Sequence, residues 1–400
     1  MTASNNCSPG LYIHIPFCQS KCPYCDFYSL TTPELIAAYL SALDNEAQIY
    51  SAQMPANGGT GVSPVPAQAK ACGYLDTPFL EFYSLYLGGG TPSLLNGAQL
   101  SALVASLRRH FDFALDTEVT LEANPDDVTS EKLACYRDLG VNRLSLGVQS
   151  FDEAELRFLG RRHTARQTEA AIELIRAAGF DNLGLDLIYG LPGQTEAAWL
   201  QTLKKAVGFR PEHLSCYQLT LEPETPLGEK QARGEIKPLG EEAQAALFLA
   251  TSLFLEEQGY RHYEISNFAR GETYFSRHNR KYWQHAPYLG LGPAAHSFDG
   301  RMRWWNCRSV AEYCRQLAEG QAPVGGSEML TDEQLRLEAL SLGFRTREGV
   351  GLELVRQYSR WEQVLAELQR AKLVKIQEQR LIPTRQGFLV ADRLPLFFVN

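Results

Sequence analysis

Residues 11–29 read LYIHIPFCQSKCPYCDFYS, a short apolar run followed directly by three cysteines. The apolar residues Leu11–Ile15 predict a strand. The loop after this strand holds Cys18, Cys22 and Cys25 in a C-x3-C-x2-C spacing. Three thiolates this close together can converge on one metal ion or cluster, and soft sulfur donors favour iron–sulfur or zinc. The stretch therefore predicts a metal centre at the end of the first strand.

The number of ligands bears on which metal this is. A structural zinc site normally takes four protein ligands, and only three are clear, because Phe27 stands two residues after Cys25. Cys7 and His14 are conceivable fourth ligands, so zinc stays open on spacing alone. On a four-iron cluster, three cysteines would leave one iron open to an exogenous ligand.

Beyond this loop, short apolar runs alternate with longer amphipathic stretches. The predicted strands are Leu11–Ile15, Phe82–Leu87, Glu118–Leu121, Arg143–Val148, Asn182–Ile188 and His213–Leu219. The amphipathic stretches include Glu34–Tyr50, Gln99–Arg109, Arg166–Ala178 and Glu196–Val207. Parallel strands require crossover connections, so repeated β-then-α units predict a parallel sheet. Six such units predict an α/β fold with an open or partly closed (β/α)6 barrel, short of a full barrel.

The chain divides into three predicted parts. Residues 1–225 would form the partial barrel, with a Gly-, Pro- and Ala-rich stretch at 53–77 predicted as a flexible surface insertion. Residues 226–325 contain a predicted helix, Glu242–Glu257, and an aromatic-rich region expected to complete the barrel. Residues 326–400 predict a small winged-helix-like domain from two helical patterns and a hairpin-like pair: Asp332–Leu342, Arg360–Ala371, Leu373–Ile376 and Leu381–Pro383.

The composition excludes several classes of protein. The 400 residues carry 38 Lys and Arg against 46 Asp and Glu, a net charge of −8, which argues against a dedicated nucleic-acid binder. Apolar residues make up 44% and charged residues 21%, which excludes a largely disordered or collagen-like chain. No apolar run approaches the roughly 18 residues that cross a bilayer, and the N-terminus lacks a secretory signal. We expect a cytoplasmic protein whose nine cysteines serve a metal or catalysis rather than disulfides.

The cysteine loop after the first strand of a βα barrel resembles the radical S-adenosylmethionine superfamily. There the open iron is chelated by the amino and carboxylate groups of the methionine moiety, and electron transfer to the sulfonium yields a 5′-deoxyadenosyl radical. The resemblance covers nearly the whole chain. Four signatures that occur in order make it more specific: YIHIPFC, GGGTPS, LGVQSF and LDLIYGLPGQT. They are similar to the family of oxygen-independent coproporphyrinogen III oxidase and its haem-chaperone relatives.

Ligands of a βα barrel bind at the C-terminal ends of the strands. At these ends, the glycines at 88–90 allow the backbone to approach a ligand closely, and their free amides are expected to bind the carboxylate or amine of a bound amino acid. A carboxylate or amide at a strand end can bond ribose hydroxyls or an ammonium, although each could instead cap a helix. Arg161 could pair with the methionine carboxylate. By resemblance, the S-adenosylmethionine site consists of Tyr12, Cys18, Cys22, Tyr24, Cys25, Gly89, Gly90, Thr91, Glu122, Gln149, Arg161 and Asp186, with Thr220 and His296 as looser matches.

Three features separate the sequence from the oxidases of that family. Those oxidases carry a fourth cysteine where Phe27 stands, and a long N-terminal extension before the first strand, which here begins by Leu11. The segment RHNRKYW at 277–283 resembles the H-N-x-x-Y-W motif associated with haem in the chaperone branch. The resemblance implies haem contacts from an imidazole that can ligate iron and from aromatic rings that pack on the macrocycle: His278, Tyr282 and Trp283. Spacing alone favours an ordinary histidine in an aromatic core or interface patch, and the resemblance reverses that preference. His262, His285 and His296 are rival ligands in the same aromatic stretch.

The resemblance therefore implies a haem chaperone with a [4Fe-4S] cluster and S-adenosylmethionine, which passes haem to acceptor haemoproteins and does not oxidise coproporphyrinogen. A radical enzyme acting on a tetrapyrrole is the alternative. A metal-stabilised regulatory protein that uses its winged-helix-like tail is a second alternative. A membrane-associated acceptor and a homodimer are both compatible with the sequence, and no nucleic-acid partner is expected.

Overall fold

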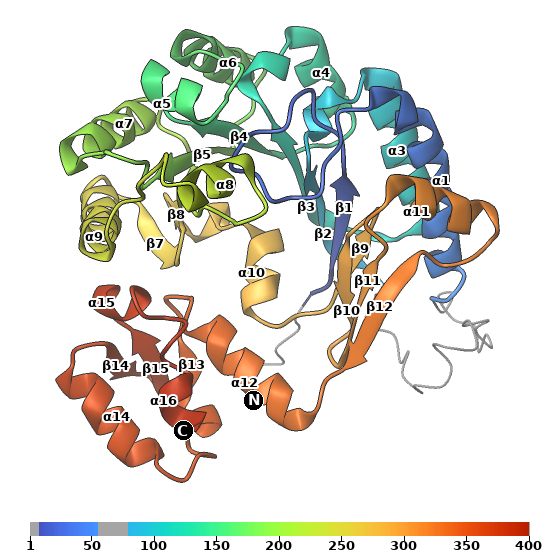
Figure 1. Cartoon of the computed structure of the whole chain (residues 1–400). Coiled ribbons are helices and arrows are strands. Elements are labelled where there is room, and N and C mark those ends of the chain that lie inside the picture. The colour runs from blue at the N-terminus through green and yellow to red at the C-terminus, as the bar shows by residue number, and fades with distance from the viewer. Residues whose placement is uncertain (1–7, 55–78, 400) are drawn as a thin grey trace.

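The computed structural model describes residues 8–54 and 79–399. In this part of the chain, twelve strands form one sheet in the order β12-β11-β10-β9-β1-β2-β3-β4-β5-β6-β8-β7 (Figure 1). The strands are β1 (Gly10–Ile15), β2 (Phe82–Gly89), β3 (Phe113–Ala123), β4 (Arg143–Gln149), β5 (Leu183–Tyr189), β6 (His213–Gln218), β7 (Arg261–Glu264), β8 (Asn267–Ala269), β9 (Tyr288–Leu291), β10 (His296–Phe298), β11 (Met302–Asn306) and β12 (Val324–Met329).

The six predicted strands are β1 to β6, and they pair in parallel in chain order. The predicted α/β architecture is confirmed. β1 lies inside the sheet, because β9 pairs with its other edge in parallel. Beyond β6 the sheet continues antiparallel through β8 and β7, and beyond β9 through β10, β11 and β12. Strands from the region 226–325 therefore extend the sheet at both edges.

The helices between β1 and β6 connect the parallel strands and pack on the outside of the sheet, and further helices follow β6 (Figure 1). They are α1 (Ile36–Ser51), α3 (Gly97–His110), α4 (Ser130–Asp138), α5 (Glu153–Phe158), α6 (Ala165–Ala177), α7 (Glu196–Gly208), α8 (Pro226–Ala232), α9 (Glu241–Glu257), α10 (Arg277–Trp283) and α11 (Val310–Ala318). Local signals define several of their starts: Asn96 with Gln99 forms a capping box on α3, and Thr164 with Gln167 forms one on α6. Strands such as β5 are buried along nearly their whole length, as expected for a parallel sheet covered on both faces.

Two features of the observed elements differ from the predicted ones. β3 begins at Phe113 rather than Glu118. Its first residues, 113–116, are partly or fully exposed, and Asp116 and Thr117 separate the apolar residues 113–115 from the rest of the strand. The short helices α4 and α5 are absent from the predicted set, and α4 buries only Leu133 and Tyr136, too few residues to show a period. The predicted insertion at 53–77 lies, from residue 55 onward, outside the described residues.

The C-terminal part has a hydrophobic core of its own, made of residues between Leu340 and Phe398. Its elements are α12 (Asp332–Gly343), β13 (Val350–Gly351), α13 (Leu352–Val355), α14 (Trp361–Arg370), β14 (Val374–Gln377), β15 (Arg380–Pro383), α15 (Arg385–Phe388) and α16 (Leu396–Val399). The predicted hairpin is the antiparallel pair β14–β15, joined by β13 into a three-stranded sheet. No helix among the described residues is both long enough and apolar enough to cross a membrane.

Candidate functional site

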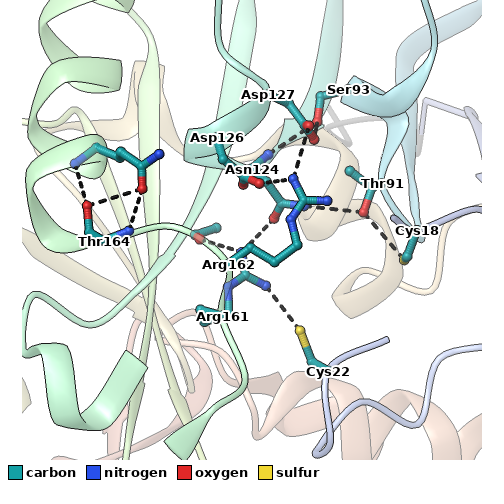
Figure 2. Close-up of polar contacts among 12 residues, drawn as sticks. Cys18, Cys22, Thr91, Ser93, Asn124, Asp126, Asp127, Arg161, Arg162 and Thr164 are labelled. Carbon is teal, nitrogen blue, oxygen red and sulfur yellow. Dashed lines mark hydrogen bonds and ion pairs between the residues drawn. The ribbon is translucent and has the colours of Figure 1, made fainter. Parts of the chain in front are cut away.

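The cysteine loop follows β1 directly. The amide of Cys18 donates to the carbonyl of Leu30 at 2.9 Å, and the amide of Cys25 donates to the carbonyl of Cys22 at 3.1 Å, so both ends of the loop are held by backbone hydrogen bonds. All three cysteines are free and half-buried. Two side chains, one after β2 and one after α5, point at their sulfur atoms (Figure 2): the hydroxyl of Thr91 lies 3.4 Å from Cys18, and Nη1 of Arg161 lies 3.5 Å from Cys22. Both are donors, which suits a thiolate as the acceptor.

The described donors around this loop do not form a four-ligand zinc site. Among residues 8–54 and 79–399, no group of three or more His, Cys, Asp or Glu side chains is placed to hold one metal ion. The imidazole of His14 is occupied, since Nδ1 lies 3.0 Å from the hydroxyl of Tyr12 and Nε2 lies 2.9 Å from the carbonyl of Tyr28. Cys7 lies outside the described residues. Cysteines that bind different irons of one cluster do not need to reach a single ion, so the loop still suits a cluster.

A cavity of about 620 Å³ opens beside the loop at the C-terminal ends of the parallel strands. It brings together ten of the predicted residues: Tyr24, Cys25, Gly89, Gly90, Thr91, Glu122, Gln149, Arg161, Asp186 and Thr220. Cys18 and Cys22 are linked to its wall through Thr91 and Arg161. Tyr12 and His296 lie elsewhere, in the lining of a second cavity.

The glycine turn after β2 supports the cysteine loop. The amides of Gly90 and Thr91 donate to the carbonyls of Ile15 and Phe17 at 2.8 and 2.7 Å, and the amide of Gly89 donates to Glu122 at 3.2 Å. A Cβ atom at Gly90 would lie 2.7 Å from both of those carbonyl oxygens, so only glycine lets the two segments approach this closely. The amides of Gly89, Gly90 and Thr91 are therefore already engaged, two with the segment that leads into the cysteine loop and one with Glu122, and the expectation that they are free for a ligand is wrong.

Two of the acidic side chains in the cavity wall, Glu122 and Asp186, are held by hydrogen bonds. Glu122 accepts hydrogen bonds from the hydroxyl of Tyr86 at 2.7 Å and from Gly89, while Asp186 accepts one from Ser145 at 2.9 Å. Desolvation, together with the negative charge of Asp186, raises the pKa of Glu122 to about 7. Desolvation also raises the pKa of Asp186. A positively charged ligand would relieve both effects, so this wall is suited to a cation.

Arg161 is fixed opposite the cysteines (Figure 2). Its Nη2 donates to Oδ1 of Asn124 at 2.5 Å and to the carbonyl of Gly147 at 2.9 Å. Its Nε is buried and has no hydrogen-bond partner among the described residues. The neighbouring Arg162 instead pairs with Asp126. Arg161 therefore keeps one buried donor for which an anionic group of a ligand is a suitable acceptor.

Gln149 adopts an unusual backbone conformation at the end of β4. Its φ of 64° lies in the left-handed region, which side-chain-bearing residues rarely adopt, and the pairing of β4 with β5 shifts register between Gly147 and Gln149. Such strain persists where the surroundings impose it, often at functional sites. Here the strained residue, Gln149, has its side chain in the wall of the first cavity.

Comparison with known proteins agrees with this geometry. Two family models match the chain: the radical SAM superfamily over residues 12–206 and the HemN C-terminal domain over residues 330–390. The heme chaperone HemW of Mycobacterium tuberculosis is 35% identical over 96% of this chain and 93% of that protein. The heme chaperone HemW of Bacillus subtilis is 32% identical over 96% of this chain and 97% of that protein. The chain belongs to the heme chaperone HemW family of the radical SAM superfamily.

A solved structure of the same superfamily has a similar fold. The coproporphyrinogen III oxidase HemN from Escherichia coli, a radical SAM enzyme, matches with a TM-score of 0.77 at 25% identity. The match covers 99% of this chain and 91% of that one. This chain, which is similar in sequence to the HemW proteins, therefore shares its architecture with the oxidase.

The side chains of the RHNRKYW segment do not converge on one site. His278 is only 1% exposed: its Nδ1 lies 2.9 Å from the hydroxyl of Ser84, and its Nε2 lies 3.0 Å from the hydroxyl of Tyr282. Tyr282 lines the second cavity, and Trp283 lines a groove against the C-terminal part. A haem-ligand role for His278 stays a prediction, and it would require these hydrogen bonds to break.

Several residues of the first cavity are missing from the predicted set, and two of them, Asn124 and Asn279, are polar groups that shape it. Asn124 anchors Arg161 and contacts Thr91, and the Asn-Pro pair after β3 was the available signal for it. Asn279 reaches the cavity from α10. No local signal points there, because the position of α10 depends on Glu118 of β3, which accepts hydrogen bonds from the amides of Arg277 and His278.

Proposed function

We propose that this protein is a cytoplasmic haem chaperone: it binds haem and transfers it to acceptor haemoproteins, and it carries a [4Fe-4S] cluster with S-adenosylmethionine. The observation that carries the proposal is similarity to the heme chaperone HemW of Mycobacterium tuberculosis along nearly the whole of both chains. A side chain in the cysteine loop supports this branch. Phe27 stands at the position where the coproporphyrinogen oxidases of the family have a fourth cysteine, and its side chain is 67% exposed at the edge of the cavity.

The residues of the first cavity suit both cofactors. Cys18, Cys22 and Cys25 would hold three irons, and the unpaired donor of Arg161 would bind the carboxylate of the methionine moiety. Glu122, whose pKa is raised towards neutrality, would ionise and attract the positive charge of the ligand. When bound, a reduced cluster supplies an electron that can cleave the sulfonium.

Each remaining part of the wall has a positioning role. The glycine turn after β2 would fix the distance between the cysteine loop and the ligand, because it is hydrogen bonded to Ile15 and Phe17. Thr91 and Arg161 would donate to the thiolates and so stabilise their charge. None of these roles requires the fourth cysteine of the oxidases.

The test is haem binding and transfer by the anaerobically reconstituted protein. We expect a saturable shift of the Soret band and delivery of haem to an apo-haemoprotein. We also expect no conversion of coproporphyrinogen to protoporphyrinogen. Absence of saturable haem binding, or robust coproporphyrinogen oxidation, would overturn the proposal in favour of the oxidase to which the fold is similar.

A further inference from the structure

A second cavity lies next to the first and has a different character. Its volume is about 830 Å³, and both cavities are lined by Asp26 and Phe27, so the end of the cysteine loop separates them. Besides Phe27, five aromatic side chains line it: Tyr12, Tyr28, Tyr282, Tyr288 and Trp305. A volume within the range of about 300 to 1,000 Å³ and an aromatic lining are typical of sites for flat organic ligands.

One imidazole in this lining is free. His296 of β10 stacks on Trp305, with ring centroids 5.7 Å apart and an interplanar angle of 28°. Its imidazole takes part in none of the side-chain hydrogen bonds found among residues 8–54 and 79–399. Partial burial and the positive charge of Arg303 lower the pKa of His296 below its ordinary value, which favours the neutral imidazole that can ligate a metal.

The other potential iron ligands in the lining are less suitable. His14 has both ring nitrogens engaged. Desolvation raises the pKa values of Tyr12 and Tyr288, which disfavours the phenolates that would bind iron. Desolvation also raises the pKa of Cys307, which favours its thiol over the thiolate.

A cation completes the lining. Arg308 is exposed at the cavity and stacks over the ring of Tyr28, with 5.8 Å from its guanidinium carbon to the ring centroid. Among the residues that the structure describes, it forms no ion pair, whereas Arg303 is paired with Glu328 and Glu338. Haem carries two carboxylates, and a guanidinium without an acidic partner suits one of them.

We propose that this second cavity is the haem site, with His296 as an axial ligand of the iron and Arg308 as the partner of a propionate. The inference rests on the proposed function, because it locates the haem that the chaperone would carry. It places the haem across Phe27 from the cysteine loop. This side chain takes the place of the oxidases' fourth cysteine and would face both ligands.

The test is a titration of the reconstituted full chain with ferric haem, followed in the Soret band, for wild type and His296→Ala. We expect the substitution to raise the Kd on the order of tenfold and to move the Soret maximum. Added free imidazole should restore the wild-type maximum, an effect that a merely structural role for His296 would not produce. His110→Ala is the matched control. His110 on α3 lies outside the lining of this cavity, so this variant should bind haem like wild type.

A second variant tests the propionate contact. Arg308→Gln should raise the Kd severalfold without moving the Soret maximum, because it leaves the iron ligand in place. An unchanged Kd would overturn the role of Arg308. If His296→Ala keeps the wild-type spectrum and affinity while His278→Ala loses them, the location is wrong but the chaperone function stands. If wild type itself shows no saturable binding, the proposed function fails.

Discussion

The carboxyl group of Glu122 should make binding of S-adenosylmethionine pH-dependent. Desolvation raises its pKa from 4.5 to about 7, and the nearby charge of Asp186 adds to the shift. A ligand cation beside this group favours the carboxylate, so binding lowers the pKa and releases a proton. With a pKa of about 7, roughly a tenth of the groups are ionised at pH 6 and roughly nine tenths at pH 8. Affinity should therefore increase about tenfold from pH 6 to pH 8 through this group alone.

Glu122→Gln isolates that contribution. The amide oxygen can still accept the hydrogen bonds from Tyr86 and Gly89, but the side chain no longer titrates. Equilibrium dialysis of labelled S-adenosylmethionine against the cluster-loaded proteins at pH 6, 7 and 8 measures both affinities. Titration of the ligand's own groups occurs with both proteins and cancels in the ratio. We expect the wild-type to E122Q affinity ratio to grow about tenfold across this range. A ratio that does not change with pH would refute the reasoning.

Three further outcomes follow from the geometry. Cys22→Ala should remove the broad visible absorbance of the reconstituted protein and lower its iron and sulfide content; unchanged content would show that the ligands are assigned wrongly. Glu46 is 0% exposed with a pKa raised by desolvation to about 7, so the folded state binds its proton more tightly than the unfolded state does. The free energy of unfolding should therefore fall on the order of 3 kcal/mol as the pH rises from about 4.5 to above 7, and Glu46→Gln should flatten this loss in denaturant titrations. Gly90→Ala should cost about 1 to 3 kcal/mol of stability because its Cβ would meet two backbone oxygens, whereas Gly97→Ala, with no atom closer than 3.5 Å, should not; equal denaturation midpoints would contradict the steric argument.

The positions of the six parallel strands and of the cysteine loop were predictable from the sequence. Apolar runs and amphipathic periods are local, so β1 to β6 lie within a few residues of their predicted ranges, except at the exposed start of β3. Parallel strands present their C-terminal ends at one edge of the sheet. Residues as distant in sequence as Gly90 and Asp186 therefore line one cavity, as the order of the strands led us to expect.

The uses of individual polar groups were not predictable in the same way. The glycine turn after β2 looked like a source of free amides, but the amides of Gly90 and Thr91 bind the carbonyls of a segment more than seventy residues earlier in the chain. The RHNRKYW segment looked like one haem-binding unit. In the folded chain a seven-residue helix distributes its side chains over several cavities and a buried network.

By itself the sequence determined the α/β class, the cysteine loop and the set of side chains at the ends of the parallel strands. These features depend on short-range periodicity and on the common direction of the strands. Only the tertiary structure decided which histidine faces a cavity. The imidazole of His278 is held by Ser84, 194 residues away, while the imidazole of His296 forms no hydrogen bond among the described residues. A hydrogen-bond partner that is so distant in the chain cannot be predicted from the residues next to the histidine.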